Sequence, residues 1–337
     1  MLVLLAVLIA LPVFTVFAAG GGQAGGSQAG GGQSQQKIVM RWSEVNSETT
    51  IRVQMMRRII QEVNTKCGGR VEIQGHPASA LGGSRDTVEG IQAGMIEMIT
   101  EGPAQFASWV PIFSIAEAPY IYRDIDHLHK TLNGPFGERL NAELLKKNVR
   151  ILGSLYYGTR QLSTTKTEIK SVKDLQGLKI RVPEVKAYVE MINSWGARPT
   201  PITIGELYLS LSTNVVDGQE NPLPTFEAQK FSEIQKYIIL TDHIICPSMI
   251  FINENTWKKI SPADQKIIQE AVNNGIAWNN TETIKAEEAL KKSLADKGVT
   301  IIKPDVESFR AVTAPWLIRT MEDAWGKGTW EFIQNIK

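Results

Sequence analysis

One arginine in this chain has the residue type and the local setting needed to bind a carboxylate. Arg181 lies in the apolar segment 178–182, where strand alternation places it on the face opposite its apolar neighbours. Pro183 ends that strand, so Arg181 lies near the carboxyl edge of a sheet, where ligands bind in open α/β folds. A planar guanidinium donates two hydrogen bonds to one carboxylate. The segment therefore indicates a site for a small organic acid, and the alternative is an arginine on a solvated strand face.

Two further polar residues are placed to support such a site. Asn221 follows a turn at 217–218 and precedes Pro222, which favours an extended backbone. Its side-chain amide could add a hydrogen-bond donor without adding charge. Arg160 supplies a second cation directly after an expected crossover between two domains. The turn has the alternative interpretation of an ordinary surface turn.

Length and composition indicate a soluble protein of two domains. The chain has 337 residues, of which 43% are hydrophobic and 21% are charged, and single cores rarely grow to this size. The formal net charge of +1 gives no argument for binding to nucleic acid or to a membrane surface. Attraction for an anion must therefore come from individual arginines.

The N-terminal residues predict export. Residues 2–17 form an uncharged apolar run followed by two alanines, which indicates a signal peptide at 1–19 and a periplasmic protein, although no basic residue precedes the run. An uncleaved membrane anchor is the alternative, but Pro12 interrupts a run that is already short for a bilayer span. Residues 20–36 contain only Gly, Gln, Ala and Ser and predict a disordered tether.

Only two cysteines, Cys67 and Cys246, occur in the chain. Two cysteines do not make a disulfide framework, so we expect two unpaired thiols, although an exported compartment would permit a disulfide.

The periodicity of apolar residues predicts an α/β fold. Strands are expected at 37–42, 70–74 and 95–100, and helices at 50–66 and 84–94. This alternation is typical of a mostly parallel sheet covered by helices.

The second half of the chain predicts another α/β unit. It extends over about 158–246, with a strand near 244 that returns to the first domain. Ser261 is the expected N-cap of a helix that continues to about residue 297, long enough to act as a strut along both domains. The predicted organisation is lobe 1 at 37–157 plus about 247–290, lobe 2 at 158–246 plus about 291–315, and a C-terminal helical segment at 316–337.

A series of segments resembles the solute receptors of TRAP (tripartite ATP-independent periplasmic) transporters of the DctP type, in order and in spacing. The matching segments are 81–85, 177–183, 199–202, 206–208, 216–222, 230–236 and 261–269, and the resemblance covers residues 37 to about 303. It implies a two-lobed periplasmic-binding-protein-like fold, with two α/β domains joined by crossing hinge strands. It also implies a monomer that closes over an organic acid and delivers it to membrane subunits, with no cofactor, metal or nucleic acid.

The resemblance also implies roles for individual residues. Arg181 matches the arginine that pairs with the ligand carboxylate, and Asn221 matches the asparagine that supports it. Arg160 resembles a second arginine of the sialic-acid-binding branch, where an acidic residue aligned with Glu101 contacts ligand hydroxyls. Glu44 follows the first strand, where a polar side chain facing the ligand is expected, and the alternative there is a solvated loop carboxylate.

Two departures from that branch bear on the ligand. Gln105 stands where the branch carries an arginine, and Ile204 stands where many relatives place an aromatic ring, so sialic acid is not favoured. Glu44 and Glu101 would suit a hydroxyl-rich acid and would repel a second carboxylate. The expected ligand is a monoanionic sugar acid, such as a uronate or an aldonate, and a C4-dicarboxylate or sialic acid is the alternative.

Two alternative functions, from other classes of protein, stay open. An exported enzyme is disfavoured because the chain has no zinc-protease, phosphate-loop or nucleophile-elbow motif. His127 and His129 are placed to bind a metal, but they lie in an expected surface helix. A ligand-binding protein that signals to a membrane sensor would show the same residues as a transport receptor.

Overall fold

The computed structural model describes residues 37–337. The predicted signal peptide at 1–19 and the tether at 20–36 lie outside the described residues, so both stay predictions.

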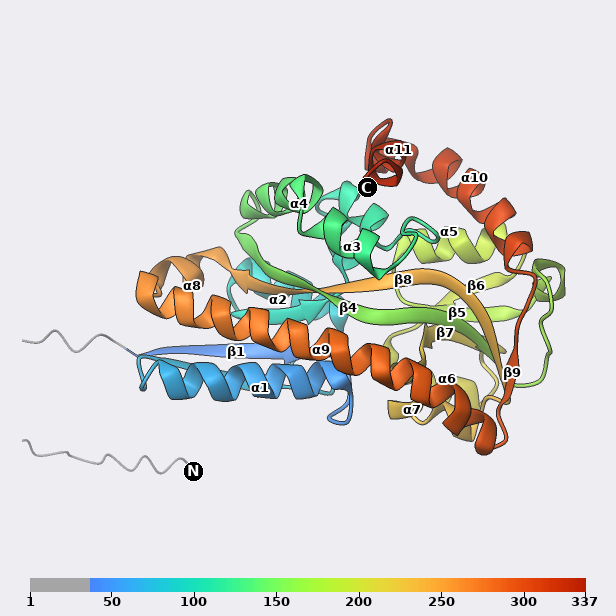
Figure 1. The fold of residues 1–337 in the computed structure, drawn as a ribbon, viewed down its shortest axis with the longest axis horizontal. Coiled ribbons are helices and arrows are strands. Elements are labelled where there is room, and N and C mark those ends of the chain that lie inside the picture. Colours follow the sequence, from blue (N-terminus) through green and yellow to red (C-terminus); the bar gives the residue numbers. More distant parts are fainter. Residues whose placement is uncertain (1–36) are drawn as a thin grey trace, which may run out of the picture. The chain divides into compact units, whose positions relative to one another are not determined.

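Within residues 37–337, nine strands form one mixed sheet with the order β2-β1-β3-β8-β4-β7-β5-β6, and β9 pairs with β8 (Figure 1). The expected parallel pairs are present at both ends, where β1 pairs with β2 and β3 and where β5 pairs with β6 and β7. The central pairs that β8 makes with β3 and β4, and that β4 makes with β7, are antiparallel. The strands are β1 (Ile38–Glu44), β2 (Val71–His76), β3 (Met98–Glu101), β4 (Val149–Thr164), β5 (Lys179–Val182), β6 (Arg198–Pro201), β7 (Gly218–Pro222), β8 (Tyr237–Asn253) and β9 (Thr300–Ile302).

Helices connect and cover these strands. They are α1 (Ile51–Lys66), α2 (Ser84–Ala93), α3 (Ile125–Leu132), α4 (Pro135–Leu145), α5 (Lys186–Ser194), α6 (Ile204–Ser212), α7 (Leu223–Ala228), α8 (Glu254–Lys259), α9 (Pro262–Asp296), α10 (Val306–Trp325) and α11 (Thr329–Gln334), with short 3₁₀ turns η1 (Pro103–Phe106), η2 (Pro111–Glu117), η3 (Val172–Leu175) and η4 (Phe231–Glu233).

The strands β4 and β8 carry the chain between the two ends of the sheet. They pair along nearly their whole length, with register shifts that include one between Tyr156 and Gly158. β8 pairs with β3 only through 249–252, and β4 pairs with β7 only through 160–164. Each long strand therefore belongs to one half of the sheet at one end and to the other half at the other end. The predicted return strand is confirmed, but it begins at Tyr237 rather than near 244.

The long helix α9 lies along elements from both halves, as the strut prediction requires. Ser261 caps it by accepting a hydrogen bond from the Asp264 backbone N–H at 3.1 Å. It contacts α1 and β4 toward one end and α7 and β9 toward the other (Figure 1). Gly275 permits the close contact with α1, because a Cβ at that position would lie 2.4 Å from Cγ1 of Ile59.

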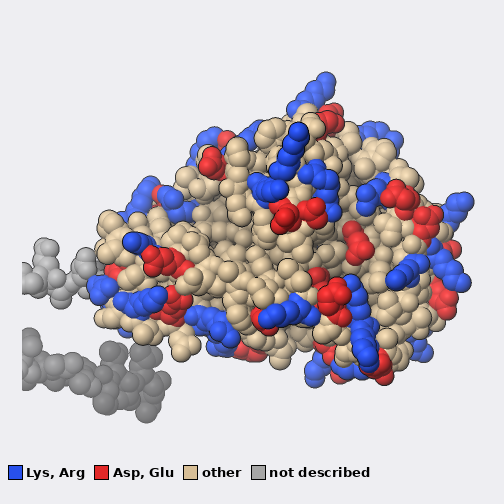
Figure 2. Space-filling view, viewed as in Figure 1, with Lys and Arg blue, Asp and Glu red and all other residues tan. Residues whose placement is uncertain are grey.

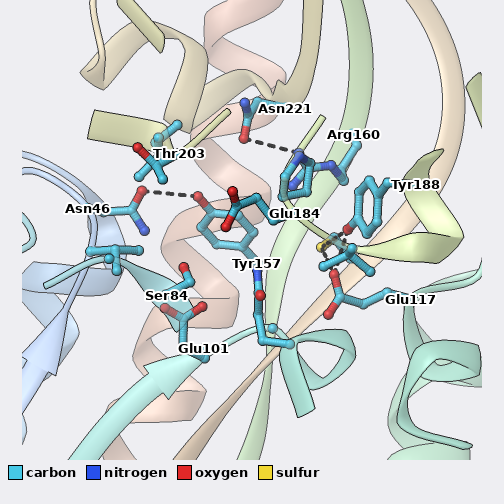
Figure 3. A pocket seen from close by; sticks show the side chains of 18 of the residues that line it. Asn46, Ser84, Glu101, Glu117, Tyr157, Arg160, Glu184, Tyr188, Thr203 and Asn221 are labelled. Carbon is cyan, nitrogen blue, oxygen red and sulfur yellow. Dashed lines mark hydrogen bonds between the residues drawn. The ribbon is translucent and has the colours of Figure 1, made fainter. Parts of the chain in front are cut away.

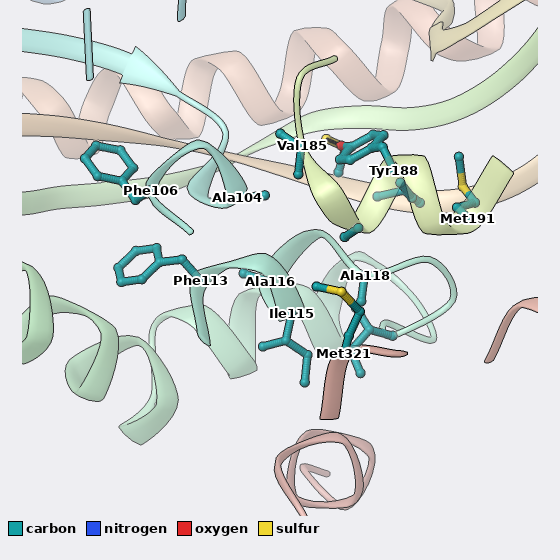
Figure 4. Packing of buried hydrophobic residues seen from close by; sticks show 14 of the residues in the cluster. Ala104, Phe106, Phe113, Ile115, Ala116, Ala118, Val185, Tyr188, Met191 and Met321 are labelled. Atoms are coloured by element: carbon teal, nitrogen blue, oxygen red, sulfur yellow. Dashed lines mark hydrogen bonds between the residues drawn. The ribbon is translucent and has the colours of Figure 1, made fainter. Parts of the chain in front are cut away.

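Three clusters of buried apolar side chains stabilise these elements. One lies between β1, α1 and the start of α9, and another lies between α6, α7 and the end of α9. The largest joins residues from both predicted lobes and brings η1, η2, α5 and α10 together (Figure 4). The predicted division at residue 315 falls inside α10, which is continuous there. The lobe boundaries themselves stay a prediction.

The surface carries charges of both signs. Figure 2 shows Lys and Arg side chains interspersed with Asp and Glu over the face in view, in keeping with the small net charge. None of the helices in the described part of the chain is both long and apolar enough to span a bilayer.

Gly158 lies where β4 crosses between the halves, and its conformation requires glycine. Its φ is +129°, and an added Cβ would lie 2.5 Å from Cβ of Pro222 and 3.0 Å from Oε1 of Glu287. We expect Gly158→Ala to lower the free energy of unfolding by about 1–2 kcal/mol more than Gly177→Ala does, since both sites have positive φ but a Cβ at Gly177 meets nothing within 4 Å. Urea denaturation of both variants checks this, and equal losses would contradict a packing constraint at the crossover.

Candidate functional site

A cavity with about 810 Å³ of empty space, part of it open to solvent, lies between the two halves of the sheet. The walls come from the loop after β1, α1, α2 and β3 on one side and from β5, α5, α6 and β7 on the other (Figure 3). Six of the seven predicted site residues line it, namely Glu101, Gln105, Arg160, Arg181, Ile204 and Asn221.

Arg181 is a buried cation in this cavity without an acidic partner. Strand β5 places it opposite the apolar core side chains of Ile180 and Val182, as alternation predicts, and only 3% of its surface is exposed. Its Nε donates to the carbonyl oxygen of Ile202 at 2.8 Å. Within residues 37–337, its terminal nitrogens have no hydrogen-bond partner and no carboxylate lies within ion-pair distance.

The pKa of Arg181 shows the electrostatic consequence. The pKa of Arg181 is lowered to about 10, mainly by burial; Glu220 opposes this shift and the nearby charge of Arg160 adds to it. The guanidinium is therefore charged at neutral pH but lacks a counterion. An anion in the cavity would supply one.

Arg160 also lines the cavity, but its charge is already compensated. Its Nε and Nη2 donate to the carboxylate of Glu220, and Nη2 also lies 3.3 Å from Oδ1 of Asn221. His243 Nε2 lies 3.1 Å from the same carboxylate. Burial alone would raise the pKa of Glu220, but Arg160 and His243 outweigh that effect and lower it. Arg160 is thus part of a neutralised group rather than a free anchor.

Asn221 lies beside this group at the end of β7. Its Oδ1 faces Arg160, and its Nδ2 donates to Oε1 of Gln219 at 2.5 Å. An amide nitrogen carries two donors, so one remains for a ligand oxygen.

Glu44 does not line the cavity, and the structure places it neither at the ligand space nor in solvent. It is fully buried at the end of β1. Its carboxylate accepts bonds from Arg52 Nε at 2.7 Å and Nη2 at 2.5 Å, and from Asn46. The expected ligand-facing role is therefore not supported, because Arg52 and Asn46 occupy the carboxylate.

Arg52 is one of the cavity residues that sequence reasoning missed. Its Nη1 donates to Oγ of Ser248 at 3.0 Å, and its guanidinium lies 4.7 Å from the centre of the Tyr157 ring. Burial alone would lower the pKa of Arg52, but the pair with Glu44 raises it overall. A signal was present in the sequence, since Arg52 shares a helical face with buried Met56, Ile59 and Val63.

Glu101 is a buried carboxyl group whose hydrogen bonding is incomplete. It ends β3 beside Ser84 (Figure 3), and its Oε1 has no hydrogen-bond partner in the described part of the chain. Burial raises the pKa of Glu101 to about 7, which Arg52 opposes and Glu44 reinforces. Close to neutral pH this carboxyl therefore exists in both protonation states.

The remaining wall is partly aliphatic. Ile204 and Gln105 line the cavity at α6 and η1, so neither an aromatic ring nor a further arginine lies at those two positions. Tyr188 donates to Oε2 of Glu117 at 2.5 Å next to Cys246. Both Cys246 and Cys67 are free, buried thiols.

The prediction that His127 and His129 both lie on a surface helix is not met in α3. His127 is buried, and its Nε2 lies 2.9 Å from the carbonyl oxygen of Ile333. Across residues 37–337, no three His, Cys, Asp or Glu side chains are grouped closely enough to hold a metal ion.

Comparison with known proteins identifies the family. The model for bacterial extracellular solute-binding proteins of family 7 (DctP) matches residues 42–323. The chain is 34% identical to the sialic acid-binding periplasmic protein SiaP of Vibrio cholerae, over 81% of this chain and 88% of that protein.

Solved structures give the same result. A TRAP periplasmic solute-binding protein from Polaromonas, bound to D-erythronate, superposes with a TM-score of 0.85 at 28% identity, over 89% of this chain and 99% of that one. One from Chromohalobacter salexigens, bound to D-glucuronate, has a TM-score of 0.83 at 27% identity, over 88% and 100%. This chain belongs to the DctP family of TRAP solute-binding proteins and has their two-lobed α/β fold.

The group formed by Arg160, Glu220 and His243 predicts a large effect on stability. Glu220→Gln would leave the buried Arg160 cation without its carboxylate, and we expect a loss of about 3–5 kcal/mol in the free energy of unfolding. The exposed pair of Arg85 and Glu89 provides the control, and Glu89→Gln should change stability by less than about 0.5 kcal/mol. Chemical denaturation measures both, and a loss under about 1 kcal/mol for Glu220→Gln would refute the assignment.

Glu101 predicts a pH-dependent effect. Its folded pKa of about 7 lies above the unfolded value, so its contribution to stability is present below about pH 4.5 and is lost as the pH rises through 7. A glutamine at this position does not titrate. The free energy of unfolding of Glu101→Gln should therefore exceed that of wild type by about 2 kcal/mol more at pH 8 than at pH 5. Thermal unfolding at the two pH values tests this with Glu89→Gln as control, and a pH-independent gain would show that Glu101 does not titrate in this range.

Proposed function

We propose that this chain is a periplasmic receptor that binds a monoanionic sugar acid, such as a uronate or an aldonate, and delivers it to the membrane subunits of a TRAP transporter. The observation that carries the proposal is Arg181, a buried guanidinium that faces the cavity without a counterion. A ligand carboxylate provides that counterion and accepts two parallel hydrogen bonds.

The charge balance of the cavity supports a single negative charge on the ligand. Arg52 is paired with Glu44 and Arg160 with Glu220, so each of these cations is already neutralised. Arg181 alone is uncompensated among the cavity arginines. One carboxylate therefore balances the site, and a second would meet the acidic side chains of Glu101 and Glu117.

The remainder of the lining suits hydroxyl groups. Glu101, Ser84 and Asn46 bring acceptors and donors to the side of the cavity opposite Arg181, and Asn221 has one N–H remaining. The structures similar to this chain include complexes with D-erythronate and D-glucuronate, which are acids of this class.

Binding would draw the two lobes together. Arg181 and Asn221 belong to the proposed lobe 2 (158–246 plus about 291–315), and Glu101 belongs to the proposed lobe 1 (37–157 plus about 247–290). A ligand that contacts both lobes only in the closed form shifts the population toward that form, by as much as its affinities for the two forms differ.

Sialic acid is the second candidate ligand, because the relative from Vibrio cholerae is named a sialic acid-binding protein. Gln105 and Ile204 favour the smaller acids, since they give the cavity neither an extra cation nor a ring at these positions.

Arg181→Lys tests the carboxylate clamp. An ammonium group cannot form the two parallel bonds of a guanidinium, so we expect affinity for the best-binding acid to fall at least about a hundredfold. The acid comes from a thermal-shift screen of uronates, aldonates, C4-dicarboxylates and sialic acid, since a ligand that binds only the folded protein raises Tm. Calorimetry gives the affinities, with exposed Arg85→Lys as control. Binding within threefold of wild type would place the carboxylate elsewhere.

A further inference from the structure

One carboxylate oxygen at the cavity has no hydrogen-bond partner in residues 37–337, whereas two other buried carboxylates are fully bonded. Glu44 and Glu220 are each held by an arginine and by other donors. Glu101 is 4% exposed and lines the same cavity, yet its Oε1 accepts no hydrogen bond in residues 37–337. Glu101 lies among the side chains that line the cavity (Figure 3), so an unpartnered carboxylate oxygen on it points to a partner that a bound ligand supplies.

The groups around Glu101 allow either protonation state. Arg52 on α1 is the cation that favours the ionised carboxylate, and Glu44 at the end of β1 is the anion that opposes it. Ser84 at the start of α2 and the backbone of Gly102 also favour the charged form, whereas burial favours the neutral one. Because Arg52 is already paired with Glu44, its influence is only partial.

We propose that Glu101 selects the class of ligand through its own proton: the ionised carboxylate accepts hydrogen bonds from the hydroxyls of a sugar monoacid, and the protonated carboxyl admits a diacid with a second carboxylate at that end. The inference rests on the proposed function, because Arg181 must hold the first carboxylate in both cases.

The two states differ in hydrogen-bonding capacity. An ionised carboxyl group only accepts hydrogen bonds, so it matches hydroxyl donors and repels a carboxylate. A protonated carboxyl group has one O–H donor, which a ligand carboxylate can accept in a short, charge-assisted bond. Binding of a diacid should therefore be accompanied by proton uptake, and binding of a monoacid by proton release. A pKa of about 7 places the exchange of states near neutral pH.

Matched acid pairs test this selection. Isothermal titration calorimetry of the purified protein at pH 5.5 and pH 8.5 would measure the affinities of D-gluconate and D-glucarate, and of D-galactonate and D-galactarate. Both acids of each pair are open chains, and they differ only in whether one end is a hydroxymethyl group or a carboxylate. Because an ionised Glu101 must take up a proton before a diacid binds, we expect the ratio of monoacid to diacid affinity to increase at least about tenfold from pH 5.5 to pH 8.5. Repeating the titrations in buffers of different ionisation enthalpy gives the number of protons exchanged.

Glu101→Gln is the decisive variant, and exposed Glu89→Gln is its control. The glutamine cannot titrate, so the affinity ratio should stay within about twofold between the two pH values, whereas Glu89→Gln should behave as wild type. A constant ratio in wild type, or an equal change in Glu101→Gln, would overturn this inference and leave the receptor assignment intact. If no acid of either pair binds at either pH and the thermal-shift screen finds no other sugar acid, the proposed function fails and this inference fails with it.

Discussion

The pairing of β4 with β8 is the constraint on which the rest of the structure depends. These strands are the two long ones, and the other strands attach to one end of the pair or to the other. The position of each cavity wall therefore depends on where β4 and β8 pass from one half of the sheet to the other. Glu287 on α9 fixes the crossing from outside, because its carboxylate accepts bonds from Oη of Tyr156 and from the backbone N–H of Thr159, both at 2.6 Å. A small rotation at this crossing would move the two walls relative to each other without breaking either half of the sheet.

Electrostatics then determines what the cavity accepts. Three guanidinium groups are buried around one cavity. Each has lost the water that would hydrate it at the surface, and this desolvation costs free energy. Two of them are neutralised inside the protein, by Glu44 and by Glu220. These pairs also hold Arg52 and Arg160 in fixed positions, so that their remaining N–H groups point in defined directions. Arg181 differs because its single bond goes to a backbone carbonyl. The free-energy cost of burying it is thus left for the ligand to offset.

Local sequence patterns predicted the residues whose role depends on their own element. Arg181 follows from strand alternation before a proline, and the capped start of α9 follows from Ser261 and Pro262. Glu44 was expected after the first strand and facing the ligand, but it ends β1 and pairs with Arg52 on the following helix, a contact that a strand pattern cannot show. Arg52 was missed for the same reason, because an arginine is predicted to be exposed unless its buried counterion is known. The early start of β8 was also missed, because strands lengthen through pairing with β4, which is a tertiary contact.

The state of Glu101 connects stability with binding. A buried carboxyl with an oxygen that has no partner in residues 37–337 destabilises the folded protein whenever it is ionised. A glutamine would fill nearly the same volume without that cost, so packing alone does not account for a carboxyl group at this position. The same argument applies to Arg181, whose charge also lacks an acidic partner within residues 37–337. Both unpaired groups lower the stability of the folded protein, and in the proposed complex both would gain a partner from a ligand with a carboxylate at one end and hydroxyls at the other. Under this proposal, the free-energy cost of burying them is what favours such a ligand.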